Sequence, residues 1–117
     1  MMTVSCKLGV DAEEAALNRP ALVLRPLEVA DVQAFLVGRQ APTLRKLLEP
    51  EGPALRALGI WPMLALRGEL QALLAGIAAR QLPDQLVLAL TLQRLDTVCG
   101  TAQEFGMNLY VTVEAES

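Results

Sequence analysis

Residues 63–79 read MLALRGELQALLAGIAA, and residues 85–105 read QLVLALTLQRLDTVCGTAQEF. In both stretches apolar residues recur every three or four positions, which is the spacing of one helix face. The first stripe comprises Met63, Leu66, Leu70, Leu73 and Ile77, and the second comprises Leu88, Leu92, Leu95, Cys99 and Ala102. The intervening QLPD, residues 81–84, breaks the pattern, and Pro83 suits the first position of a helix. The two stretches therefore predict a long antiparallel helical hairpin.

One part of this hairpin fits two interpretations. Leu86, Leu88, Leu90 and Leu92 also alternate with period two, so Gln85–Leu92 has the pattern of a strand as well. Leucine and alanine are weak strand formers, and the helical stripe continues to Ala102. We therefore favour a helix throughout and keep the strand as the alternative.

Both ends of the chain alternate with period two. Thr3–Val10 places Val4, Cys6, Leu8 and Val10 on one face, and Met107–Glu114 has the same pattern. Strands this short and one-sided need partners, so we expect them to pair and to pack against the hairpin. At 117 residues without an internal repeat or linker, the chain is predicted to be one α+β domain, residues 1–117, with a small sheet.

Shorter elements fill the first third of the chain. Asp11 and Glu14 have the spacing of a capping box, which predicts a helix over Ala12–Leu17. Residues 21–25 lie between two prolines and predict a brief edge strand. A helix over Glu28–Val37, closed by Gly38, follows from the next apolar periodicity.

Residues 39–62 contain four prolines and two glycines, so they cannot form one long element. Pro42 and Pro53 suit the first position of a helix, and we expect single helical turns over Thr43–Leu48 and Ala54–Leu58. Because binding sites concentrate on irregular segments held by a rigid scaffold, this region is the favoured location for a site.

Residues 24–36, LRPLEVADVQAFL, resemble the opening strand and helix of the acetyl-coenzyme A dependent N-acetyltransferase family. The resemblance covers about a tenth of the chain. That family's loop, Arg/Gln-x-x-Gly-x-Gly/Ala, cradles the pyrophosphate at a helix start and is absent downstream. Neither the activity nor the cofactor follows, and we expect no cofactor.

Composition excludes several function classes. The chain has no histidine, so histidine-based acid–base catalysis, Ser-His-Asp triads and His-ligated zinc are excluded. A net charge of −3 and 3% aromatic residues argue against a nucleic-acid partner. Arg67 and Glu69 interrupt the most apolar segment, which argues against a membrane span. The first residues do not resemble a secretory signal, so we expect a cytoplasmic protein. Arginine residues outnumber lysine residues, which favours a bacterial source.

No constellation of catalytic or metal-binding residues is recognisable, and none is predicted. Cys99 lies on an apolar stripe, so we expect core packing; catalysis is the alternative. Arg67 and Glu69 are expected on a polar helix face, with ligand orientation as the alternative. For Trp61 we favour a buried cap on the core over an exposed anchor rimmed by basic residues. The candidate partner-binding residues are Arg45, Lys46, Arg56 and Trp61.

Of the residues, 53% are hydrophobic, so a monomer of this size would leave apolar side chains exposed to water. We therefore expect an apolar face that packs against a partner. The candidate interface residues are Leu64, Leu74, Leu86 and Leu90. The sequence favours a non-enzymatic, homodimeric module that acts by binding another protein. A secretion-type chaperone or phage-type inhibitor is one alternative. A small-molecule carrier or minor enzyme with an apolar pocket, lined by Arg67, Glu69 or Cys99, is the other.

Overall fold

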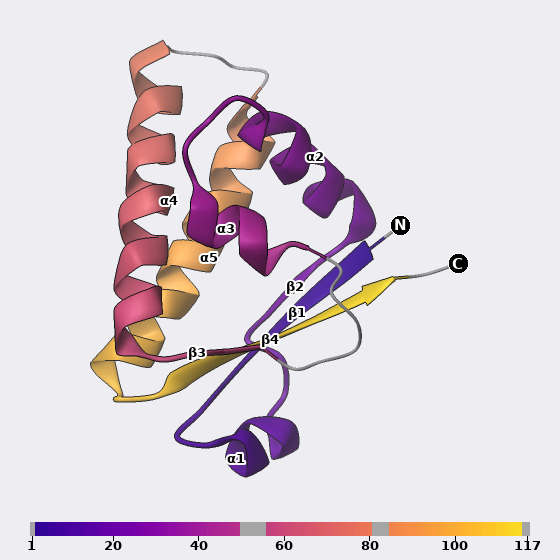
Figure 1. Ribbon diagram of the computed structural model, residues 1–117, viewed down its shortest axis with the longest axis vertical. Coiled ribbons are helices and arrows are strands. Elements are labelled where there is room, and N and C mark those ends of the chain that lie inside the picture. Colours follow the sequence, from indigo (N-terminus) through magenta and orange to yellow (C-terminus); the bar gives the residue numbers. More distant parts are fainter. Residues whose placement is uncertain (1, 50–55, 81–84, 116–117) are drawn as a thin grey trace.

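The computed structural model describes residues 2–49, 56–80 and 85–115, and shows the predicted α+β fold (Figure 1). A four-stranded antiparallel sheet has the strand order β2-β1-β4-β3. Its strands are β1 (Met2–Gly9), β2 (Leu22–Leu24), β3 (Arg56–Leu58) and β4 (Asn108–Ala115). The helices are α1 (Ala12–Leu17), α2 (Pro26–Leu36), α3 (Pro42–Leu47), α4 (Ile60–Arg80) and α5 (Leu86–Glu104).

The terminal strands pair as predicted. β1 and β4 are the two central strands, and they run antiparallel from Met2↔Ala115 to Gly9↔Asn108. The pairing places Val4 opposite Val113 and Cys6 opposite Val111, and all four side chains are buried under the helices. Because side chains alternate along a strand, this register sends the polar residues Ser5 and Thr112 to the opposite face.

The two long helices form the predicted hairpin. Figure 1 shows α4 and α5 side by side and antiparallel, and both helices pack against the sheet. The alternative of a strand over Gln85–Leu92 is wrong, because α5 is helical from Leu86. The core contains Leu88, Leu92, Leu95 and Cys99. The helical stripe, and not the local alternation of leucines, therefore predicts the structure of this segment correctly. The predicted start at Pro83 lies outside the described residues.

The shorter predictions are confirmed at α1, β2, α2 and α3. Asp11 accepts a hydrogen bond from the Glu14 N–H at 2.8 Å and thereby caps α1. α2 begins at Pro26, two residues before the predicted start, because proline is favoured in the first turn of a helix. It ends before Gly38, whose φ of 76° is a conformation that glycine adopts without strain.

The prediction of a helical turn over Ala54–Leu58 is wrong in its described part. Residues 56–58 form β3, an edge strand that pairs antiparallel with β4 through Ala57↔Tyr110 and Leu58↔Leu109. Leu58 is buried against the inner face of the sheet. The hydrogen bonds to β4 come from the far end of the chain, and therefore no local pattern indicated them. Pro53 and Ala54 lie outside the described residues.

The core lies between the sheet and the large helices. This core includes Leu92 and Leu95 of α5 and Leu109 of β4, and all three are at most 1% exposed. On the other face, α1 covers only one end of the sheet (Figure 1). There the Lys7 ammonium donates to the carbonyl of Ala16, and Ala15 packs against Gly9. In Figure 1, α4 lies along one edge of the molecule.

Candidate interaction surface

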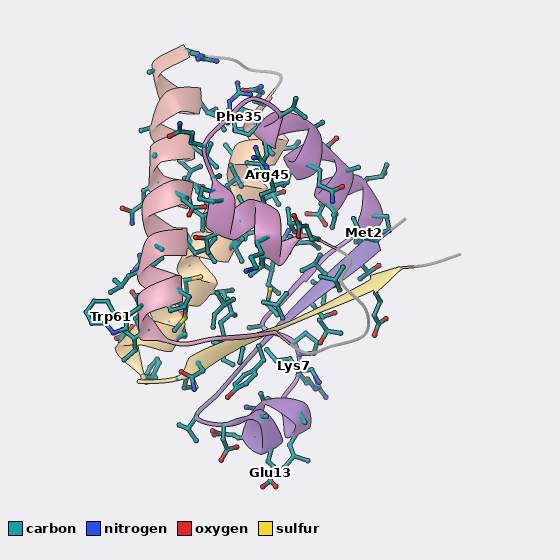
Figure 2. The ribbon with its side chains drawn as sticks, in the orientation of Figure 1. Met2, Lys7, Glu13, Phe35, Arg45 and Trp61 are labelled. Atoms are coloured by element: carbon teal, nitrogen blue, oxygen red, sulfur yellow. The ribbon has the colours of Figure 1, made fainter. Side chains whose placement is uncertain are left out.

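Trp61 is exposed, and the favoured prediction of a buried cap is therefore wrong. Its side chain is 80% exposed and projects from the first turn of α4, away from the body of the protein (Figure 2). The helix register explains this orientation. Met63 is buried, and two residues along an α-helix correspond to about 200°, so Trp61 lies on the opposite side of α4. The exposure of Trp61 agrees with the alternative, whereas its role as an anchor stays a prediction.

The side of α4 that bears Trp61 is uncharged along its whole length. Its exposed residues are spaced as a second helical stripe: Trp61, Leu64, Ala65, Gly68, Ala72, Ala75 and Ala79. We call these residues the outer α4 face. The buried stripe of Met63, Leu66, Leu70 and Ile77 lies opposite. α4 is thus apolar on two sides, whereas a surface helix normally has a polar outer side.

The charged residues inside α4 are turned away from this face. The Arg67 Nε donates to Asp96 Oδ1 of α5 at 2.9 Å, and its Nη1 donates to Gln103 Oε1 at 2.9 Å. Glu69 accepts hydrogen bonds from the backbone N–H groups of Thr43 and Leu44, at 3.1 and 3.0 Å. Arg67 therefore ties α4 to α5, and Glu69 caps α3.

Sequence reasoning missed the capping role of Glu69. A signal for it was present, because α3 begins with Ala41 at its N-cap, and alanine has no side-chain acceptor for the free N–H groups of the first turn. The expectation that Arg67 and Glu69 share one polar face is wrong, because two residues correspond to about 200° around the helix, and Arg67 binds α5 whereas Glu69 binds α3. Both are engaged within the chain, so neither is set to orient a ligand.

The two cysteines are buried free thiols. Burial raises the pKa of the Cys99 thiol to about 11; the Asp96 carboxylate acts in the same direction, and the Arg67 guanidinium opposes it. Burial also raises the pKa of Cys6, to about 12, and the nearby Cys99 contributes. A nucleophilic cysteine needs a lowered pKa and access to solvent. Cys99 has neither, and it packs in the core as predicted.

The candidate partner-binding residues do not form one cluster. The Arg45 guanidinium donates to the carbonyls of Leu36 and Arg39, at 2.6 and 2.8 Å, and so closes the end of α2. Lys46 lines a surface groove of about 530 Å³ between α3, β3 and the start of α4. Trp61 lies next to Pro62, another residue of this groove, but on the outer α4 face. The side chain of Arg56 lies outside the described residues.

The candidate interface leucines differ in their exposure to solvent. Leu64 of α4 is exposed by 46%, and Leu86 and Leu90 of α5 are exposed by 63 and 51%. Leu74 is half-buried and packs against the core, so it contributes to the contact between the helices. The remaining charged contact of the hairpin, Arg94 with Glu28 of α2 at 3.2 Å, also lies within the chain.

Comparison with known proteins adds no functional information: no family model, no curated protein and no solved structure matches this chain. Within the described residues, no group of three or more acidic or cysteine side chains is arranged to hold a metal ion. No described helix is long and apolar enough to cross a membrane. We therefore base the proposed function on the outer α4 face.

Proposed function

We propose that the chain is a non-enzymatic, homodimeric protein-interaction module of the bacterial cytoplasm, which acts by binding another protein. The observation that carries this proposal is the outer α4 face with Trp61 at its head. A solvent-exposed tryptophan on an uncharged, continuous helix face is typical of an interaction hot spot. The exposure of Leu86, Val87 and Phe105 by 63 to 66% extends apolar surface over the same hairpin.

The groove beside α3 is the surface proposed for the other protein. Leu47, Leu58 and Pro62 give it an apolar lining, and Lys46 supplies a cation. This apolar lining fits a polypeptide segment that presents an apolar side chain. Thr43 also lines the groove, and its backbone is fixed by the Glu69 cap, so one wall is held rigidly.

No particular observation supports the alternative of a small-molecule carrier or minor enzyme. A carrier would need space between the hairpin and the sheet, and core side chains such as Leu92, Leu95 and Leu109 fill that space. The residues suggested for its pocket are Arg67, Glu69 and Cys99, and they are engaged in an ion pair, a helix cap and the core.

Site-specific photo-crosslinking in the source cell tests the proposed function. A photoreactive phenylalanine analogue replaces Lys46 in one variant and Glu13, which is exposed on the distant α1, in a control (Figure 2). We expect the Lys46 variant to form an adduct with one other protein that the Glu13 variant does not form. A Lys46→Glu exchange in a strain crosslinked from Thr43 should remove that adduct. Identical adducts from both positions, or none from the groove, would contradict the proposal.

A further inference from the structure

We propose that two copies of the chain pair through the outer α4 face, with the two α4 helices antiparallel and a two-fold axis between Gly68 and Ala72. The inference rests on the proposed function, since it gives the dimer of that proposal its surface and geometry. A two-fold interface uses the same patch on both copies, so the patch must be complementary to itself. Three properties of α4 meet this requirement.

The first property is a gradient of side-chain size along the face. Trp61 and Leu64, the large residues, lie in the first turns of α4, and Ala72, Ala75 and Ala79 occupy the second half. In an antiparallel pair, Trp61 of each copy lies against the small residues near Ala79 of the other copy. A parallel pair would place Trp61 against Trp61 and leave a gap between the alanines. Close packing therefore favours the antiparallel arrangement.

The second property is the position of the charges at the ends of the hairpin. Arg80 is exposed at the end of α4, and Glu104 is exposed at the end of α5. Since α4 and α5 are antiparallel, these two residues lie at opposite ends of the molecule (Figure 1). Antiparallel pairing brings Arg80 of one copy to the end that holds Glu104 of the other, twice in the dimer. A parallel pair would instead bring the two Arg80 side chains together.

The third property is area. A helix of 21 residues is about 31 Å long and 10–12 Å across, so one side of it offers roughly 500 Å². Two such sides bury about 1,000 Å², close to the lower limit for a specific interface. The absence of charge from the outer α4 face means that no ion has to be desolvated there. Phe105 at the end of α5 is a further exposed apolar residue of the hairpin, with 66% of its surface accessible.

Light scattering coupled to size exclusion tests the pairing over a concentration series. We expect twice the 12.6 kDa chain mass for the wild type. Ala72→Arg places two cations next to the proposed axis and should give a monomer. The matched control is Ala30→Arg, also an exposed alanine inside a helix, in α2. The control should stay dimeric, and circular dichroism should show unchanged helix content in both variants.

Spin-label distances test the orientation. Cys6 and Cys99 are buried, so a label attaches selectively to an introduced cysteine. In the antiparallel pair, labels on Ala79→Cys lie at least about 27 Å apart, because each is some nine residues from the axis at 1.5 Å per residue. Labels on Gly68→Cys lie much closer to each other. Short distances at both positions indicate a parallel pair and would overturn the inference.

A wild-type monomer, or a dimer that persists in Ala72→Arg, would also overturn it. Either result is separable from the proposed function, because the crosslink from the groove at Lys46 is scored independently. A monomer that still forms the groove adduct refutes the α4 pairing and leaves binding to another protein in place.

Discussion

The carboxylate of Glu69 and the backbone N–H of Leu44 are joined by a hydrogen bond of 3.0 Å across 25 positions of sequence. The second oxygen of the same carboxylate accepts the N–H of Thr43. One side chain of α4 thus replaces the N-cap that Ala41 cannot provide to α3. α3 in turn forms one wall of the groove, so this contact couples the long hairpin to the surface proposed for the other protein.

Replacing Glu69 with alanine should therefore destabilise the protein by about 0.5–2 kcal/mol, the usual cost of a lost helix cap. The change should be concentrated at α3, with faster amide exchange at Thr43 and Leu44. Urea denaturation and hydrogen exchange measure the two effects. Asp31→Ala, at an exposed carboxylate inside α2, is the matched control and should change the free energy of unfolding little. Equal losses in both variants would argue against a capping role.

The ion pair of Arg67 and Asp96 leads to a second prediction. Their side chains are 30 and 19% exposed, so breaking the pair leaves a partly buried carboxylate without its main partner. Arg67→Met should cost about 1–3 kcal/mol of the free energy of unfolding. Adding Asp96→Asn should recover part of this loss, because the neutral amide is less costly to bury. A double variant whose loss equals the sum of the single losses would show that the two residues do not interact.

Most of the framework followed from local patterns in the sequence. The stripe from Leu88 to Ala102 and the alternation in residues 107–114 each repeat often enough to define an element and its buried face. Pairing of the terminal strands followed because each was too short to be stable alone. The wrong prediction at residues 56–58 arose where three residues carry no period, and where a strand exists only because β4 is adjacent.

The candidate surface was predicted less well. The sequence indicated surplus apolar residues on the hairpin, but Trp61 was favoured as buried because its neighbours Ile60 and Pro62 are apolar. Its orientation depends on the phase of α4, which Met63 and Leu66 set by entering the core. The contacts of Arg45 were not predictable, since they depend on the end of α2. For Glu69, the alanine at the N-cap of α3 indicated that an acceptor was needed, but not which residue supplies it. Whether the outer α4 face binds a second copy stays a prediction.

Replacement of glycine by alanine should have opposite effects on stability at two positions. A Cβ on Gly9 would lie 2.6 Å from the backbone nitrogen of Ala15, so α1 would have to move away from the sheet. Gly9→Ala should therefore destabilise the protein by about 1–3 kcal/mol. Gly76→Ala in α4 meets no atom within 4 Å and should stabilise the helix by up to about 1 kcal/mol. Thermal unfolding of both variants checks this; stabilisation by Gly9→Ala would contradict the packing of α1.

The buried thiols predict loss of stability at high pH. The pKa of Cys99 is about 11 and that of Cys6 about 12 in the folded protein, above the ordinary value of 9.0. Their contribution is complete below pH 9, because both thiols are then protonated in either state. It is lost as pH rises from 9 to the folded-state pKa of each thiol, about 11 for Cys99 and about 12 for Cys6, at up to about 1.4 kcal/mol per pH unit for each thiol.

Urea denaturation between pH 8 and pH 10.5 measures this dependence. Cys99→Ala should show a shallower decline than the wild type, since one of the two thiols is gone. A thiol reagent at pH 8 should react only after unfolding. Rapid modification of the folded wild type that disappears in Cys99→Ala would show that Cys99 is accessible, against its observed burial.

Trp61 is the only tryptophan, so its fluorescence reports directly on the outer α4 face. In a monomer it is 80% exposed; in the proposed dimer it packs against the second copy near Ala79. Dilution should therefore shift its emission to the red and increase quenching by iodide, over the concentration range in which light scattering shows dissociation. Ala72→Arg should have the spectrum of the dilute wild type at every concentration. If the wild type dimerises while its emission and quenching stay constant, Trp61 lies outside the interface, and the antiparallel pairing of α4 is refuted.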